Sequence, residues 1–361
     1  MTIKINRYAT SISVLCLLAL TGCNSSSSVS TTSDSTATTM DSSTTTTNST
    51  SALGSTTSST STFDVGCDYN YSAYNDSASV EADSEASWAC SSTERTLTAN
   101  GVPDHAVGTF PNAGNPNTIS AQTVAISYTL TPTQAATATE LGGPRGAQGY
   151  VLNGVKIDAS TAGSCADNAT SIATGNGDDC SLVDNSNSWS IEALGQTSFN
   201  FGTDDNNAHV QPGGAYHYHG MPEGFITARG GDNTKMTMIG WAADGYPIYA
   251  RYGYTDALDA TSDIKAMTGS YQLIADSQVS SGRPSSDIIP MGTFRQDWEY
   301  VEGSGDLDAC NGRTGVTPEF PNGIYHYYAT DTYPYFQRCV NGTVATTGAG
   351  GPPLGGMPPQ Q

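Results

Sequence analysis

The chain has 361 residues, with 34 acidic and 13 basic side chains and a formal net charge of −21. This charge excludes binding to a nucleic-acid backbone, which needs a basic surface, and it disfavours electrostatic docking on anionic lipid. The length is sufficient for one large domain or two smaller ones.

The first 22 residues have the layout of a bacterial lipoprotein signal. Basic residues precede an apolar stretch at 12–20, which is too short to span a bilayer. A Leu-Thr-Gly-Cys sequence ending at Cys23 follows and resembles a lipobox, whose cysteine is lipidated and becomes the mature N-terminus. We therefore expect a membrane contact through the lipid anchor only. Asn24 favours the outer membrane, and an ordinary secretory signal is the alternative.

The composition then divides the remaining chain into three parts. Residues 23–62 are almost all Ser and Thr without apolar periodicity, which predicts a disordered tether. Residues 343–361 are rich in Gly and Pro and predict a loose tail. The folded domain is therefore expected at 63–342.

Cysteine usage agrees with export to an oxidising compartment. Besides Cys16 in the signal and Cys23, six cysteines remain, and an even number in an exported chain predicts disulfides. Their positions favour three local pairs: Cys67–Cys90, Cys165–Cys180 and Cys310–Cys339.

The first elements of the folded part are expected between residues 123 and 157. Residues 123–130 alternate apolar and polar side chains, which predicts a half-buried strand. Residues 132–140 are compatible with a short helix. Residues 150–157 predict a hairpin, because Asn153-Gly154 suits the two positive-φ positions of a type I′ turn.

Further strands are expected at 235–241 and 246–249, with a turn at Asp244-Gly245, and a short helix is compatible with 255–267. No repeat with a fixed period is evident. Together these elements predict a single all-β or β-dominated domain, sandwich-like or barrel-like, with long ordered loops.

The chain has only five histidines, and two of them lie two residues apart. A strand has a period of two, so His217 and His219 should share one face, with Cβ atoms about 7 Å apart. Both rings could then bind one ion, and we expect copper or zinc, which imidazole suits. Proton competition predicts weaker binding below about pH 6.5.

A second Tyr-His-Tyr sequence lies at 325–327 and makes His326 the expected third ligand, from a strand placed beside the first. His209 and His105 are accessory candidates, and Asp104 would orient a histidine ring from behind.

Several longer motifs resemble one known family. They are the segments 100–112, 215–220, 240–249, 310–320 and 325–335. The chain is similar over roughly 95–342 to the YHYH-domain family, whose members are usually exported and have no established activity. The resemblance implies that the two Tyr/His motifs are its signature.

A second pattern suggests a carboxylate ligand. His217-x-His219-x3-Glu223 resembles a cupin metal motif, and His326 fits the second motif of that fold. The long separation of the two segments and Pro222 argue against a cupin, but Glu223 stays a candidate ligand.

The leading hypothesis is an envelope-anchored lipoprotein that binds Cu or Zn through His217, His219, His326 and Glu223. Two alternatives remain open: a glycan- or protein-binding module with structural histidines, and a metal-dependent hydrolase. In the hydrolase, Glu223, Asp104 or Asp244 would act as the base.

Overall fold

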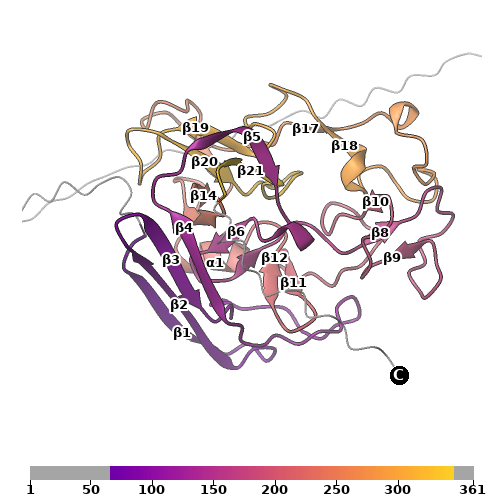
Figure 1. Cartoon of the computed structure of the whole chain (residues 1–361), viewed down its shortest axis with the longest axis horizontal. Coiled ribbons are helices and arrows are strands. Elements are labelled where there is room, and N and C mark those ends of the chain that lie inside the picture. Colours follow the sequence, from indigo (N-terminus) through magenta and orange to yellow (C-terminus); the bar gives the residue numbers. More distant parts are fainter. Residues whose placement is uncertain (1–65, 345–361) are drawn as a thin grey trace, which may run out of the picture. The chain divides into compact units, whose positions relative to one another are not determined.

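The computed structural model describes residues 66–344, and strands dominate this part of the chain (Figure 1). The prediction of a β-dominated fold is confirmed. The described residues hold one α-helix, α1 (Glu223–Ala228), and three 3-10 turns (Gly143–Arg145, Asp276–Gln278 and Arg295–Asp297). Among these residues there is no helix of the length and apolarity that a membrane span requires. The expected signal sequence with Cys23, the expected tether and the chain from 345 lie outside the described residues.

The first sheet is an antiparallel meander of four consecutive strands. In spatial order they are β1 (Tyr69–Asn75), β2 (Ala82–Cys90), β3 (Glu94–Ala99) and β4 (Val124–Thr129). The expected strand at 123–130 is confirmed as β4. Its Val124, Ile126 and Tyr128 are buried and alternate with more exposed side chains, as period two requires.

The second sheet has eight strands and is the largest in the described residues. Its spatial order is β11 (Ala208–Val210), β12 (Tyr216–Tyr218), β7 (Lys156–Ile157), β6 (Gly149–Val151), β13 (Met238–Ala242), β14 (Pro247–Tyr249), β20 (Ile324–Tyr328) and β19 (Gly312–Gly315).

This sheet is an internal duplication. In one half β6 and β7 pair antiparallel, β7 and β12 parallel, and β12 and β11 antiparallel. In the other half β13–β14, β14–β20 and β20–β19 repeat these three pairings in the same chain order. The halves join through the antiparallel pair β6–β13, so a pseudo-twofold axis runs between these two strands. The sequence shows no fixed period because the loops between counterpart strands differ in length.

The hairpins of the two halves end in matching turns that dock on the four-stranded sheet. Gly154 and Gly245 have φ values of 81° and 90°. A Cβ at Gly154 would lie 2.3 Å from the Cβ of Ala99, and one at Gly245 would lie 2.5 Å from the carbonyl oxygen of Thr129. Both positions therefore require glycine. The hairpin at 150–157 is confirmed, but its turn is not type I′, because Asn153 is not among the positive-φ residues.

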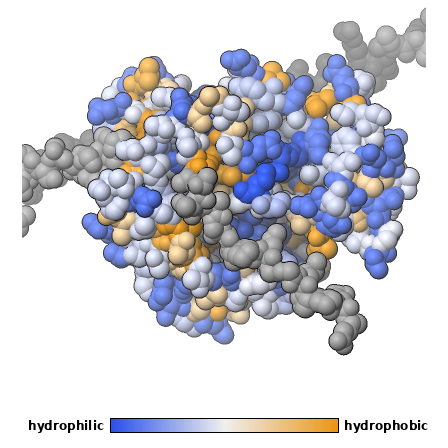
Figure 2. All heavy atoms as spheres, in the orientation of Figure 1, coloured by the Kyte–Doolittle hydropathy of each residue, from blue (hydrophilic) through white to orange (hydrophobic). Residues whose placement is uncertain are grey.

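Aromatic residues fill the space between the two sheets. Trp88 of the first sheet shares a core with Tyr150 and Trp241 of the second, and its indole N–H donates to the carbonyl of Leu152 at 3.0 Å. This packing is sandwich-like, and within 66–344 both sheets stay open rather than closing into a barrel. On the surface, Figure 2 shows small apolar groups interspersed among hydrophilic residues.

Four smaller sheets complete the fold. They are β10 (Trp189–Ser190) with β8 (Ser164–Cys165) and β9 (Cys180–Ser181), β15 (Tyr252–Tyr254) with β16 (Ile264–Ala266), β17 (Tyr271–Leu273) with β18 (Trp298–Tyr300), and β21 (Cys339–Gly342) with β5 (Gln134–Glu140).

Both expected helices are wrong. Residues 132–140 form mainly β5, because pairing with β21 overrides the helix propensity of their alanines. Residues 255–267 form turns and β16.

All three expected disulfides are confirmed: Cys67–Cys90, Cys165–Cys180 and Cys310–Cys339. Cys165–Cys180 joins β8 to β9, and Cys310–Cys339 fixes the start of β21. Each closes a loop that is small in sequence, which restricts the unfolded chain.

Candidate metal centre

Three histidines meet at the β11 end of the eight-stranded sheet. His209 on β11 lies directly opposite His217 on β12 in the antiparallel register. His219 follows β12 immediately, and its backbone N–H donates to the carbonyl of Asn207 at 2.8 Å, which continues the pairing. The strand geometry thus places all three side chains on one face of the sheet.

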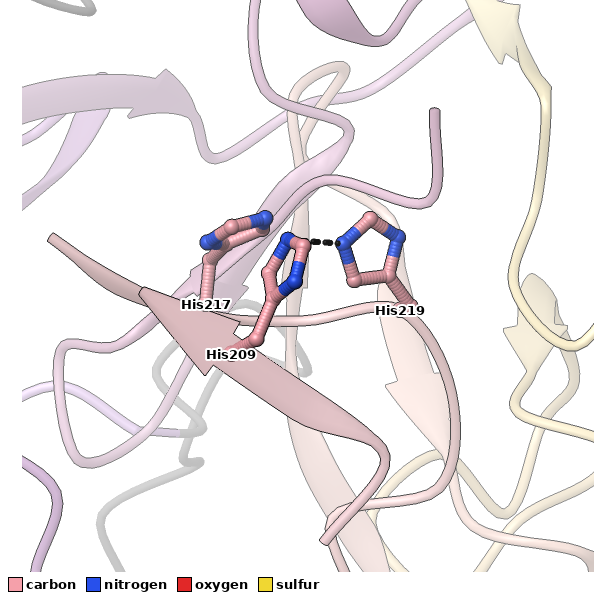
Figure 3. Close-up of side chains that lie close together, drawn as sticks. All are labelled: His209, His217 and His219. Atoms are coloured by element: carbon pink, nitrogen blue, oxygen red, sulfur yellow. Dashed lines mark hydrogen bonds between the residues drawn. The ribbon is translucent and has the colours of Figure 1, made fainter. Parts of the chain in front are cut away.

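The three rings point toward a common centre (Figure 3). Each pair of ring centroids is 4.7 Å apart, and the Nε2 atoms of His209 and His219 are 3.0 Å apart. One nitrogen from each ring lies within 4.8 Å of the others. A tetrahedral ion with bonds of about 2.0–2.1 Å holds its ligand nitrogens about 3.3 Å apart, so small ring movements would complete such a site.

Hydrogen bonds determine which nitrogens are free. Nδ1 of His209 lies 2.7 Å from the carbonyl oxygen of Phe201, and Nδ1 of His217 lies 3.3 Å from that of Ala215. Both Nδ1 atoms must therefore carry the hydrogen and donate it, which leaves a lone pair on each Nε2. These lone pairs are the ones that face the centre, as a metal site requires.

His219 completes the centre in a different protonation form. Because Nε2 of His209 is an acceptor, Nε2 of His219 donates to it, and the buried Nδ1 of His219 finds no hydrogen-bond partner among the described residues. A metal at Nε2 would move the hydrogen to Nδ1. There it would be donated to the backbone of Ala159, which already raises the pKa of this ring. The three histidines could hold a metal ion, and a cation at Nε2 of His219 would give the buried Nδ1 a hydrogen to donate.

Burial keeps the three imidazoles uncharged. It lowers the pKa of His209 and lowers the pKa values of His217 and His219 well below their usual range. The neighbouring histidines add to this effect on His217, since two imidazolium ions cannot lie side by side. Neutral imidazole is the form that binds metal.

A charged residue that the sequence analysis did not single out lies beside the histidines. Lys156 on β7 lies opposite His217 in the parallel register, and its Nζ donates to Asp158 at 3.1 Å and to Gln211 at 2.7 Å. The sequence could have indicated this position, because strand alternation in the 150–157 hairpin places Lys156 on the face opposite the buried Ile157.

His326 lies elsewhere, so its expected role as the third ligand is corrected. Five strand spacings separate β12 from β20 in the sheet, a distance of about 24 Å at 4.8 Å each. The repeated Tyr-His-Tyr motif marks counterpart strands at opposite ends of the sheet, not neighbours. Instead, His209 supplies the third ring.

The accessory candidates His105 and Asp104 lie behind the histidine strand. The tyrosine side chains of β12 point to the opposite face, where Nε2 of His105 lies 2.6 Å from the hydroxyl of Tyr218. Asp104 accepts hydrogen bonds from Asn153 and Arg229, both at 2.8 Å. Asp104 thus links the Asn153 turn to Arg229, the residue that follows α1, and these contacts orient no ring of the centre.

Like Asp104, the other two candidate carboxylates, Glu223 and Asp244, do not belong to the centre. Glu223 begins α1, and its side chain is ion-paired with Arg251. Asp244 lies in the second half, in the turn between β13 and β14, and accepts from the hydroxyl of Tyr327 at 2.6 Å. Burial raises the pKa of this carboxyl. The described residues hold one group of three potential metal ligands of the His, Cys, Asp and Glu type, and all three are histidines.

The fold and this centre define a β-sheet protein with a largely buried three-histidine group. A model of the YHYH protein family matches residues 125–342, so the chain belongs to the YHYH family. Searches of curated proteins and of solved structures return no match.

Proposed function

We propose that this protein is an envelope-anchored lipoprotein that binds one divalent transition metal, copper or zinc, through His209, His217 and His219. The observation that carries the proposal is the convergence of three neutral imidazoles, two of them buried and that of His209 half-buried, with lone pairs directed at one centre. Without an ion, this arrangement leaves a buried nitrogen unsatisfied.

The donor set narrows the choice of metal. Three imidazole nitrogens suit copper and zinc, whereas calcium and magnesium prefer oxygen ligands. At equal availability Cu²⁺ binds such a site more tightly than Zn²⁺. Three ligands leave at least one coordination position for water or another small ligand.

The anchor rests on the sequence around Cys23, outside the described residues. It is supported by the three disulfides, because such bonds persist mainly in exported proteins. The lipid would hold the protein at the cell envelope, in the outer membrane.

The metal proposal is tested with protein purified without chelator. Elemental analysis should find about one Cu or Zn per chain, and titration of the metal-free protein should give a single site. Loss of an outer partner of a metal ligand commonly costs 10–100-fold in affinity, so loss of a ligand should cost more than about 100-fold. We expect this from His209→Ala, His217→Ala and His219→Ala alike.

The chain offers a matched control. His326 occupies the counterpart position to His217 in the other half, and His326→Ala should leave metal affinity unchanged. Circular dichroism verifies that each variant is folded. Wild-type protein that binds neither Cu²⁺ nor Zn²⁺ at micromolar concentration would refute the proposal, as would equal losses in His326→Ala and His217→Ala.

A further inference from the structure

The duplication of the sheet extends to the side chains that support the histidine strand. The hydroxyl of Tyr216 donates to Asp204 at 2.7 Å in the first half, and that of Tyr325 donates to Asp308 at 2.8 Å in the second. In both halves the backbone N–H of this aspartate donates to the carbonyl oxygen of the residue four positions later, which is Ala208 at 2.9 Å in the first half and Gly312 at 2.8 Å in the second.

The turns before the outer strands match in the same way. Asn207 and Asn311 both adopt the left-handed conformation, with φ values of 55° and 60°. The carbonyl of Asn207 accepts from His219 at 2.8 Å, and that of Asn311 accepts from Tyr328 at 3.0 Å. Tyr328 is therefore the counterpart of His219.

The remaining two positions follow from the registers. His209 lies opposite His217, and Arg313 lies opposite His326. The place of His209, His217 and His219 in the first half is thus taken by Arg313, His326 and Tyr328 in the second.

We propose that Arg313, His326 and Tyr328 form a second copy of the histidine site that is closed to metal. Arg313 and Tyr328 stand where the first site has two of its ligands, and the guanidinium of Arg313 supplies the positive charge in place of the cation. The inference rests on the proposed function of the first site. The same class of divalent ion should enter the second site once both positions carry histidine.

The hydrogen bonds show how the second site satisfies itself. Nδ1 of His326 lies 2.9 Å from the carbonyl of Ile324, as Nδ1 of His217 faces that of Ala215, so its Nε2 carries the lone pair. The Tyr328 hydroxyl, 2.9 Å away, donates to this Nε2. The hydroxyl hydrogen of Tyr328 thus occupies the lone pair on Nε2 of His326 that a metal would bind.

Arg313 supplies the positive charge. Its Nη2 donates to the Tyr328 hydroxyl at 3.3 Å and to the carbonyl of Tyr254 at 2.7 Å, and its guanidinium carbon lies 5.5 Å from the centroid of the Tyr328 ring. A guanidinium is always charged and accepts no metal, so it also repels an approaching divalent ion.

The test is a gain of metal binding. The double variant Arg313→His/Tyr328→His should bind two Cu²⁺ or Zn²⁺ ions per chain, against one for the wild type, in elemental analysis and titration. Tyr328→His alone keeps the guanidinium and should still bind one. Two ions in this single variant, or one ion in the folded double variant, would overturn the inference. Wild-type protein that binds no metal would instead refute the proposed function.

A second measurement covers a double variant that does not fold. Arg313→Gln removes the charge beside His326 and keeps a hydrogen-bond donor. With chelator present, the NMR titration of the His326 ring should move to higher pH, because Arg313 lowers its pKa in the wild type. An unchanged titration would show that the guanidinium does not act on the site, and the inference would fail.

Discussion

Replacing His326 should make the protein less sensitive to acid. Burial lowers the pKa of His326 to about 4, with Arg313 on β19 adding to the effect and the backbone of Ile324 opposing it. The side chain of His326 is fully buried, and its ring centroid lies 5.3 Å from that of Tyr249 and 5.0 Å from that of Tyr328. The unfolded chain, where the pKa is about 6.5, therefore takes up a proton at higher pH than the folded protein.

The sign and size of the effect follow from this difference. A folded-state pKa below the unfolded value means that stability falls as the pH drops from about 6.5 to about 4, and falls no further below that. For His326 alone, the loss relative to pH 7 is about 1.2 kcal/mol at pH 5.5 and about 2.4 kcal/mol at pH 4.5.

Urea unfolding of the wild type and His326→Gln at these three pH values, with chelator present, measures the contribution. The other histidines and the carboxylates titrate in both proteins and cancel in the difference. We expect the variant to lose about 2.4 kcal/mol less than the wild type between pH 7 and pH 4.5. Parallel stability curves would show that His326 is not held neutral in the folded protein, and the argument would fail.

Two further predictions concern the metal centre and the anchor. Burial lowers the pKa values of His209, His217 and His219, so protons compete less with the metal for these rings. Bound metal should therefore persist on dialysis at pH 6, below the usual imidazole pKa, and leave only at lower pH. Complete release at pH 6, measured by elemental analysis, would contradict this. Cys23→Ala should leave the protein unprocessed or release it from membrane fractions, and mature protein still in those fractions would refute lipidation.

Local patterns predicted the strands and disulfides that depend on nearby residues. The alternation at 123–130 and the Asn153-Gly154 hairpin report which side of a strand is buried, and the folded protein keeps both. The same approach failed for the segment 132–140, because the strand that pairs with it, β21, lies about two hundred residues away in sequence. Pairing at such distance leaves no trace in local propensity.

The candidate site was predicted in part for a related reason. Spacing alone places His217 and His219 on one face, and the structure brings their rings together. The third ring depends on which strand lies beside β12, and that is a matter of topology. The likeness between the two Tyr-His-Tyr motifs suggested adjacency, whereas it arises from duplication, and His209 contributed no motif of its own.

The duplication also separates the residues that build the fold from those that give one half its chemistry. Tyr216 and Tyr325 bind counterpart aspartates, and both halves keep the central histidine with Nδ1 facing a backbone carbonyl. Because both halves share these hydrogen bonds although the residues around them differ, the shared contacts are explained by the strand pairing that they stabilise. His209 and His219 are present in the first half alone, at the two positions where the second half has Arg313 and Tyr328. The specific function of the protein therefore rests on these two histidines more than on the Tyr-His-Tyr sequence that the halves share.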